Sequence, residues 1–163
     1  MSETVFADAV VCDANVLLAI CSKEEATCRQ AENALENYAK AGTEFFAPNL
    51  VVGEVLYVLC RKLAEGILTE SEHKLSVESF EQMMAAISTP EKGDDSLIKR
   101  SVEIREPYGC SRTADSVYIA FAEQISHSRT VEILTFDEGL SKHASKTVPM
   151  IPVNLLPVSS PES

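Results

Sequence analysis

The fold is decided by residues 9–19, which read Ala9-Val10-Val11-Cys12-Asp13-Ala14-Asn15-Val16-Leu17-Leu18-Ala19. The short apolar run at the start of this segment predicts a buried strand over residues 9–13. The second apolar run predicts a short helix from Asn15 to Ile20. Asp13 lies between the two, where an isolated carboxylate is costly to remove from water. Asp13 is therefore the first candidate for a functional residue.

Strand-like and helix-like segments alternate along the rest of the chain. Further strands are predicted at 45–47, 86–89, 131–136 and 150–153, the last an edge strand because Pro149 and Pro152 interrupt it. Helices are predicted at 15–20, 23–41, 49–65, from the Thr69–Glu72 capping box past Met84, from Asp94 or Asp95 to 105, at 113–126 and at 138–144. This alternation predicts an α/β protein: a single-domain three-layer α/β/α sandwich with a mostly parallel sheet of four to five strands.

The composition favours one globular domain, since 45% of the 163 residues are hydrophobic. No apolar run approaches the ~20 residues that a membrane helix needs, so no membrane association is expected. The start, Met1-Ser2-Glu3-Thr4, lacks the basic region of a signal peptide. The five cysteines form no C-x-x-C pair, and Cys12, Cys21 and Cys60 lie in apolar runs. We therefore expect reduced, mostly buried thiols in a cytoplasmic protein, rather than a zinc site.

The net charge of −11 argues against a broad basic surface for nucleic acid. A local metal site could still bind nucleic acid in an acidic protein. The charge predicts weak nonspecific affinity for nucleic acid and is compatible with a basic protein partner.

Four acidic residues stand where a parallel fold would gather them: Asp13, Glu54, Asp115 and Asp137. Asp13 and Asp137 each follow a predicted strand, and ligands of such folds bind beyond the carboxyl ends of the strands. Glu54 and Asp115 lie among apolar residues early in predicted helices that could lean over the same edge. Each aspartate taken alone could simply cap a helix. Taken together, the four acids suggest a shared divalent metal ion.

The segments that carry these acids resemble the PIN-domain family, and the small VapC toxins within it, over about residues 10–153. They are Val10–Ala19, Pro48–Leu59, Thr113–Glu123 and Leu134–Leu140. The resemblance implies a PIN-like domain over 1–157, and the polar residues that follow predict a flexible tail at 158–163. It also implies a metal-dependent endoribonuclease, with the four acids as the site for Mg²⁺ or Mn²⁺ and with Thr135 and Asn15 as hydrogen-bonding supports.

The chemistry of the residues agrees with that interpretation. Mg²⁺ and Mn²⁺ prefer oxygen ligands and keep several waters. Four carboxylates could hold one or two ions, and we expect Asp13 and Asp115 to be the most direct ligands. Glu54 and Asp137 would then act through water, hold a second ion or orient the nucleophile. The four acids repel one another without metal, so some of their pKa values should be raised.

The sequence identifies residues that would contact RNA less specifically than it identifies the metal ligands. Arg112 and Lys142 lie near proposed acids and could hold phosphates of an RNA substrate, as could His143 and Lys146. Ordinary surface cations explain them equally well. The resemblance further implies an antitoxin protein as partner, for which the exposed face of helices 24–41 and 49–65 offers a groove. It also implies a homodimer, which the helix within 69–93 could serve.

Two other interpretations remain open. A PIN-like fold could act as an RNA- or protein-binding regulatory module with weak or no nuclease activity. An unrelated small α/β enzyme, such as a phosphatase-like or receiver-like domain, would normally place two acids together at the end of its first strand. Asp13-Ala14-Asn15 offers only one, and the adjacent pair Asp94-Asp95 lies in a predicted turn.

Overall fold

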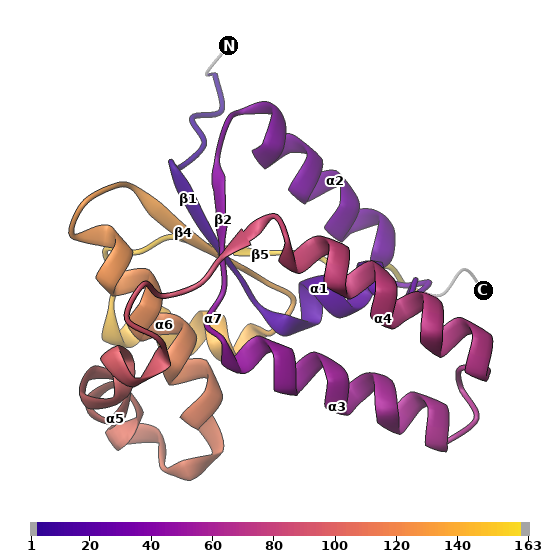
Figure 1. The fold of residues 1–163 in the computed structure, drawn as a ribbon. Coiled ribbons are helices and arrows are strands. Elements are labelled where there is room, and N and C mark those ends of the chain that lie inside the picture. The colour runs from indigo at the N-terminus through magenta and orange to yellow at the C-terminus, as the bar shows by residue number, and fades with distance from the viewer. Residues whose placement is uncertain (1–2, 161–163) are drawn as a thin grey trace.

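The computed structural model describes residues 3–160, which form a parallel sheet covered by helices on both faces (Figure 1). In this part of the chain the sheet has five strands in the order β3-β2-β1-β4-β5, and every neighbouring pair is parallel. The strands are β1 Ala9–Cys12, β2 Glu44–Phe46, β3 Ile87–Ser88, β4 Val131–Thr135 and β5 Val153–Leu155. The predicted three-layer α/β/α sandwich is confirmed.

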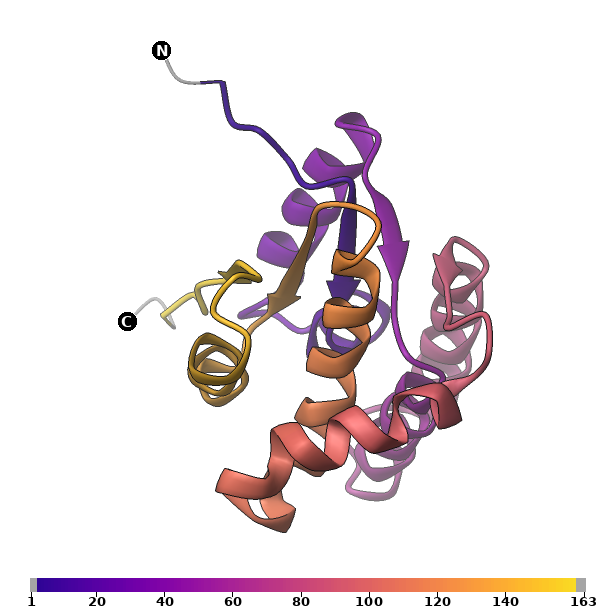
Figure 2. The ribbon, with the colours of Figure 1, turned by 90° about the vertical axis from the view of Figure 1, so that its left-hand side faces the viewer.

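Seven α-helices and three short 3₁₀ helices connect the strands within residues 3–160. The α-helices are α1 Ala14–Cys21, α2 Cys28–Lys40, α3 Leu50–Ala64, α4 Glu70–Met84, α5 Ile98–Arg105, α6 Thr113–Ser126 and α7 Glu138–Thr147. The 3₁₀ helices are η1 Asp94–Leu97, η2 Glu106–Tyr108 and η3 Cys110–Arg112. Helix α6 lies in front of the sheet in Figure 2 and α2 lies behind it. Helices α3 and α4 run side by side and extend to one side of the molecule (Figure 1).

The central strand β1 is buried over its whole length, between β2 and β4. A strand covered on both faces has no solvent side, which is why Ala9-Val10-Val11-Cys12 shows no polar alternation. Val11 pairs with Phe46 on one side and with Ile133 on the other. This pairing brings the ends of β1 and β4 to the same edge of the sheet.

Two helix caps differ in origin: one is local, and the other joins distant parts of the chain. The capping box predicted at Thr69 is present, with Glu72 as its partner. Either Asp94 or Asp95 was expected to cap the helix that follows. The carboxylate of Asp94 instead accepts the backbone N–H groups of Asn49 and Leu50, both at 2.8 Å. It thereby caps α3, whose own Asn49 side chain makes no capping bond, and it steadies the helix that carries Glu54.

Three local expectations were wrong. The helix expected from residue 23 begins at Cys28, because Lys23 adopts a positive φ of 49° and the chain turns there. The edge strand expected at 150–153 begins at Val153, since Pro152 has no N–H to donate to a ladder. The thiols were expected to be mostly buried, but only Cys12 and Cys21 are; Cys28 is half-buried, and Cys60 and Cys110 are exposed. Helix α3 buries Val51, Val55 and Leu59 with helical spacing, and the position after Leu59 falls on its outer face.

The two ends of the chain lie partly outside the described residues. The expected tail at 158–163 includes residues 161–163, which are not described. Within the described part of that tail, Ser159 donates its backbone N–H to the carbonyl of Ala26 at 3.0 Å. No helix among the described residues combines the length and the apolar character that crossing a bilayer requires.

Candidate active site at the carboxyl ends of the strands

The site is built where β1 and β4 end side by side. The backbone N–H of Asp13 donates to the carbonyl of Leu134 at 3.0 Å, so the chain leaving β1 remains bonded to β4. Asp137 follows two residues after the end of β4 and begins α7 as its N-cap. The side chains of Asp13 and Asp137 therefore start from adjacent strand ends, as the carboxyl edge of a parallel sheet requires.

The hydroxyl of Thr135 connects these two strand ends. It donates to Asp13 Oδ2 at 2.7 Å and accepts the backbone N–H of Asp137 at 2.9 Å. Asn15 Nδ2 approaches the same hydroxyl at 3.4 Å, and Asn15 Oδ1 accepts the N–H of Phe136 at 3.3 Å. Thr135 is completely buried. The two residues expected to support the site thus form a hydrogen-bonded bridge between its aspartates.

Asp13 serves as a helix cap and as a member of the site at the same time. Its Oδ1 accepts the N–H of Ala14 at 2.7 Å, which caps α1, while Oδ2 faces Thr135. The side chain is only 8% exposed. Burial, together with the negative charges of Asp115 and Glu54, raises the pKa of Asp13 to about 7, against the opposing effect of the Thr135 hydrogen bond. A carboxyl group with this pKa can exchange a proton for a cation near neutral pH.

Glu54 enters the site from α3 and is held by Tyr118 of α6. The Tyr118 hydroxyl donates to Glu54 Oε1 at 2.7 Å. Burial raises the pKa of Glu54, the Tyr118 hydrogen bond lowers it, and the charge of Asp115 raises it. Tyr118 is buried, and desolvation raises its own pKa above the ordinary value of 10.0, so it acts as a neutral hydrogen-bond donor.

Asp115 and Asp137 form ion pairs with a cation, whereas hydroxyl groups donate hydrogen bonds to Asp13 and Glu54. Arg112 Nη1 lies 2.8 Å from Asp115 Oδ2 and 3.6 Å from Asp137 Oδ2. Burial raises the pKa of Asp115, Arg112 lowers it and Asp137 raises it. Asp137 Oδ1 accepts the N–H of Gly139 at 2.7 Å, so Asp137 also caps α7.

The structure brings all four predicted acids to one place. The charge of Asp115 bears on Asp13 and on Glu54, and that of Asp137 bears on Asp115. Every offered ligand is a carboxylate oxygen, which suits Mg²⁺ or Mn²⁺ better than a soft metal. Within residues 3–160, no three His, Cys, Asp or Glu side chains are placed closely enough to enclose an ion by themselves. Mg²⁺ needs no such enclosure, since one or two carboxylates and several waters usually bind it. The donor set therefore fits a hydrated divalent cation.

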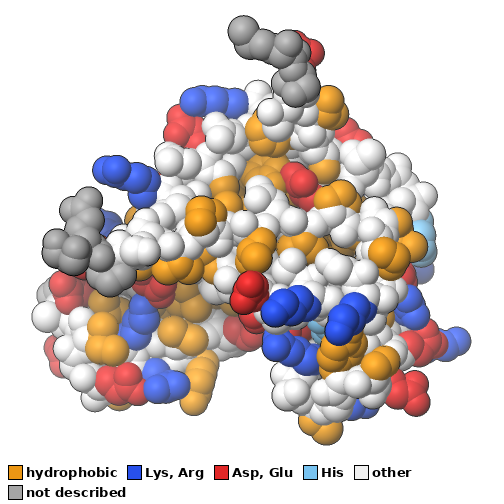
Figure 3. Space-filling view, turned by 180° about the vertical axis from the view of Figure 1, so that it is seen from behind, with side chains coloured by type: hydrophobic (Ala, Val, Ile, Leu, Met, Phe, Trp, Pro, Cys, Tyr) orange, Lys and Arg blue, Asp and Glu red, His pale blue; other side chains and the backbone are white. Residues whose placement is uncertain are grey.

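The cations predicted to contact RNA differ in their exposure and in their partners. Lys142 and Lys146 lie exposed on α7, and Figure 3 shows lysine and arginine side chains gathered beside a hollow in the face seen from behind. Arg112 is instead paired with the acids of the site. His143, expected among the surface cations, is completely buried, and its Nε2 lies 3.0 Å from the carbonyl oxygen of Ile104. It is a core residue, and a phosphate contact by His143 is ruled out in this conformation.

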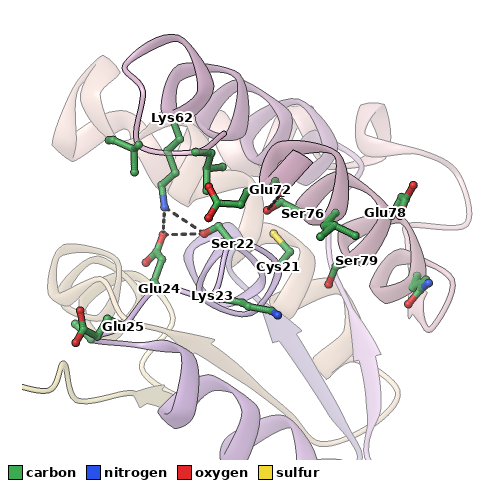
Figure 4. A pocket seen from close by; sticks show the side chains of 15 residues that line it. Cys21, Ser22, Lys23, Glu24, Glu25, Lys62, Glu72, Ser76, Glu78 and Ser79 are labelled. Carbon is green, nitrogen blue, oxygen red and sulfur yellow. Dashed lines mark hydrogen bonds and ion pairs between the residues drawn. The ribbon is translucent and has the colours of Figure 1, made fainter. Parts of the chain in front are cut away.

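A groove of about 840 Å³ lies apart from the acids, between the turn after α1 and the α3–α4 pair. Lys62, Glu24 and Ser22 line this groove, and Lys62 Nζ lies 2.8 Å from Glu24 Oε1 and 3.1 Å from Ser22 Oγ (Figure 4). The exposed apolar side chains of Ile67 and Leu75 line it. The groove uses the beginning of the expected 24–41 segment and the end of α3, so it only partly coincides with the surface expected from the sequence.

Sequence reasoning missed the parts played by Tyr118 and Asp94. Tyr118 was interpreted as part of an apolar helix, although it stands three residues after Asp115 and hence on the same helix face. That spacing was the available signal. The cap that Asp94 supplies to α3 had no local signal, because it joins residues 44 and 45 positions apart.

Comparison with known proteins agrees with this fold. A crystal structure of VapBC2 from Rickettsia felis bound to a DNA fragment from their promoter contains a chain with a similar fold. The TM-score is 0.57 at 13% sequence identity, covering 91% of this chain and 99% of that one. No curated protein matches the sequence. The family model described as PIN domain matches residues 10–146, which include all four acids. The chain belongs to the PIN-domain family.

Proposed function

We propose that this protein is a metal-dependent endoribonuclease that hydrolyses phosphodiester bonds of RNA. The observation that carries the proposal is the meeting of Asp13, Glu54, Asp115 and Asp137 at one sheet edge, where burial raises the pKa of the first three. Acids gathered together with raised pKa values are candidates for a functional site. Membership of the PIN-domain family supports the same activity.

Asp13 and Asp115 are the proposed direct ligands of Mg²⁺ or Mn²⁺, with Glu54 and Asp137 acting through water or on a second ion. Such an ion, when bound, offsets charge on the phosphate and lowers the pKa of the attacking water. The chain supplies the positioning. Thr135 orients Asp13, and Tyr118 orients Glu54. Because the pKa of Asp13 is about 7, binding a cation at neutral pH releases a proton from part of the molecules.

RNA would approach over the exposed side of the acids. Lys142 and Lys146 lie exposed on the helix that Asp137 caps, and they can contact phosphates there. With a net charge of −11, these local cations must act against the field of the whole protein. We therefore propose weak nonspecific binding to RNA and cleavage that depends on the local site.

The assembly that we propose is that of a type II toxin with an antitoxin protein. The structural similarity to a chain of VapBC2 from Rickettsia felis supports this proposal. In the present chain, the groove between the turn after α1 and the α3–α4 pair offers a surface for an antitoxin segment. A homodimer is also proposed, with α4, the helix within residues 69–93, as the element that would serve it.

One observation favours a second candidate, a PIN-like regulatory module with weak or no nuclease activity. Arg112 pairs with both Asp115 and Asp137, and its single positive charge offsets part of their repulsion without any metal. Retention of all four carboxylates favours the nuclease.

The deciding experiment is cleavage of a panel of structured RNAs by purified protein with Mg²⁺, Mn²⁺ or EDTA. The Asp13→Asn variant is assayed beside it, with folding checked by circular dichroism. We expect cutting that requires the metal and is lost in the variant. Undiminished cleavage by folded Asp13→Asn would refute the site. Cation binding without any cleavage would favour the regulatory module.

A further inference from the structure

Arg112 lies inside the acid site and is not an ordinary surface cation. Its Nη1 contacts Asp115 at 2.8 Å and Asp137 at 3.6 Å, and its side chain is 34% exposed. Asp115 lies on α6 and Asp137 is the N-cap of α7, so the guanidinium joins separate elements of the fold.

Gly139 shows that this position of the guanidinium is sterically accommodated. A β-carbon built on Gly139 would collide with both terminal nitrogens and the central carbon of the Arg112 guanidinium. The backbone of Gly139 has no positive φ, so its conformation does not require glycine. The absence of a side chain at 139 makes room for the Arg112 head group beside Asp137.

We infer that Arg112 is a built-in counter-ion of the site and that a divalent cation binds Asp115 and Asp137 only by displacing it. The inference rests on the proposed function, in which the four acids hold the metal. The guanidinium lies against Oδ2 of both aspartates, and a divalent ion bound between these carboxylates would be repelled by the positive charge of Arg112 at short range. Arg112 therefore weakens the affinity for the metal and, without metal, relieves the repulsion between Asp115 and Asp137.

The test measures Mn²⁺ binding by isothermal titration calorimetry of the full chain. Arg112→Gln removes the charge. Gly139→Ala retains the charge but fills the space that the guanidinium uses. Arg61→Gln is the matched control, because it removes an arginine from an exposed ion pair with Glu65 on α3, away from the acids. Asp13→Asn reports whether the bound Mn²⁺ is at the proposed site.

We expect Arg112→Gln and Gly139→Ala to bind Mn²⁺ about 3–10-fold more tightly than the unchanged protein, in keeping with the modest strength of partly exposed ion pairs. Arg61→Gln should show no change. A second readout is the melting temperature, which should be lower for Arg112→Gln than for the unchanged protein in EDTA. Saturating Mn²⁺ should close that gap, because the metal takes over the role of the counter-ion.

Equal or weaker Mn²⁺ binding by Arg112→Gln would overturn the inference while leaving the proposed metal site intact. Tighter binding in Arg61→Gln as well would attribute the effect to net charge and would also overturn it, as would tightening that Gly139→Ala fails to reproduce. If the unchanged protein binds no Mn²⁺, or if Asp13→Asn binds it equally well, the proposed function itself fails and the inference fails with it.

Discussion

The acid site has two halves that limit the repulsion between carboxylates in different ways. One half is called the buried half because it contains Asp13, the most deeply buried acid; in it, the neutral hydroxyl groups of Thr135 and Tyr118 donate to Asp13 and to the half-buried Glu54. The other is called the open half because it contains Asp137, which is 40% exposed; in it, the half-buried Asp115 and Asp137 share the guanidinium of Arg112. An unpaired buried charge is costly, so the acid buried most deeply acquires a pKa near 7 and can be neutral.

The two halves should therefore respond differently to a metal ion. The hydroxyl bonds of Thr135 and Tyr118 can persist while a cation binds the other lone pairs of the same carboxylates. The guanidinium of Arg112, in contrast, already offsets the negative charge of Asp115 and Asp137 that would attract the cation. The buried half is a prearranged set of ligands, whereas the open half must exchange one positive partner for another.

The largest expected effect is on RNA cleavage, and it should differ between the two acids that share Arg112. Asp115→Asn should lower the kcat/KM for RNA about 10²–10³-fold, as the loss of a main electrostatic group does. Asp137→Asn should lower it about 10-fold, the scale of a supporting group. Steady-state cleavage with Mn²⁺ measures both, with Asp95→Asn as a control that removes an acid outside the site. Equal losses in the two variants would erase the distinction between direct and supporting acids.

The next effect is the pH dependence of stability in EDTA, which tests the buried half. The folded-state pKa of Asp13, about 7, lies above its ordinary 3.8. The stability that its protonated form contributes is therefore complete below pH 4 and is lost as the pH rises to about 7. Asp13→Asn does not titrate. Its free energy of unfolding relative to the unchanged protein should rise by about 2–4 kcal/mol between pH 4 and pH 8.

Urea denaturation at each pH measures that difference. A difference that stays constant across the range would mean that Asp13 ionises normally in the folded protein. A difference that moves the other way would mean that its pKa is lowered.

A smaller effect is expected at the bridge between the strand ends. Thr135→Val removes the donor to Asp13 and the acceptor for the N–H of Asp137, so the free energy of unfolding should fall by about 1–3 kcal/mol. Thr147→Val is the matched control, because the Thr147 hydroxyl only donates to the carbonyl of His143 within α7. If both valine variants are equally stable, Thr135 is no more than a local hydrogen bond.

The smallest effect compares two buried tyrosines. Tyr118→Phe and Tyr38→Phe each remove one buried hydroxyl and should each lower the free energy of unfolding by about 1 kcal/mol. Only Tyr118→Phe should weaken Mn²⁺ binding, because Tyr118 orients Glu54 while Tyr38 bonds Asn154. Equal Mn²⁺ affinities in the two variants would show that Glu54 needs no such support.

Much of the site could be predicted because it follows from local patterns. Asp13 and Asp137 each follow an apolar run, and parallel strands carry such residues to one edge. The support by Thr135 and Asn15 was expected from the resemblance, and in the fold both bond at that edge. The starts of the helix after Lys23 and of the strand at Val153 were harder to predict, since a single positive φ or a proline shifts an element by a few residues.

The sequence by itself determined the order of strands and helices, the parallel sheet and the four acids at its carboxyl edge, because hydrophobic periodicity and chain direction are local properties. Only the tertiary structure decided which groups meet the acids. Tyr118 reaches Glu54 across 64 residues, Asp94 caps α3 from another segment, and Arg112 turns toward Asp115 and Asp137. These contacts depend on how helices pack over the sheet, and the packing of distant surfaces is not encoded in any short stretch of the chain.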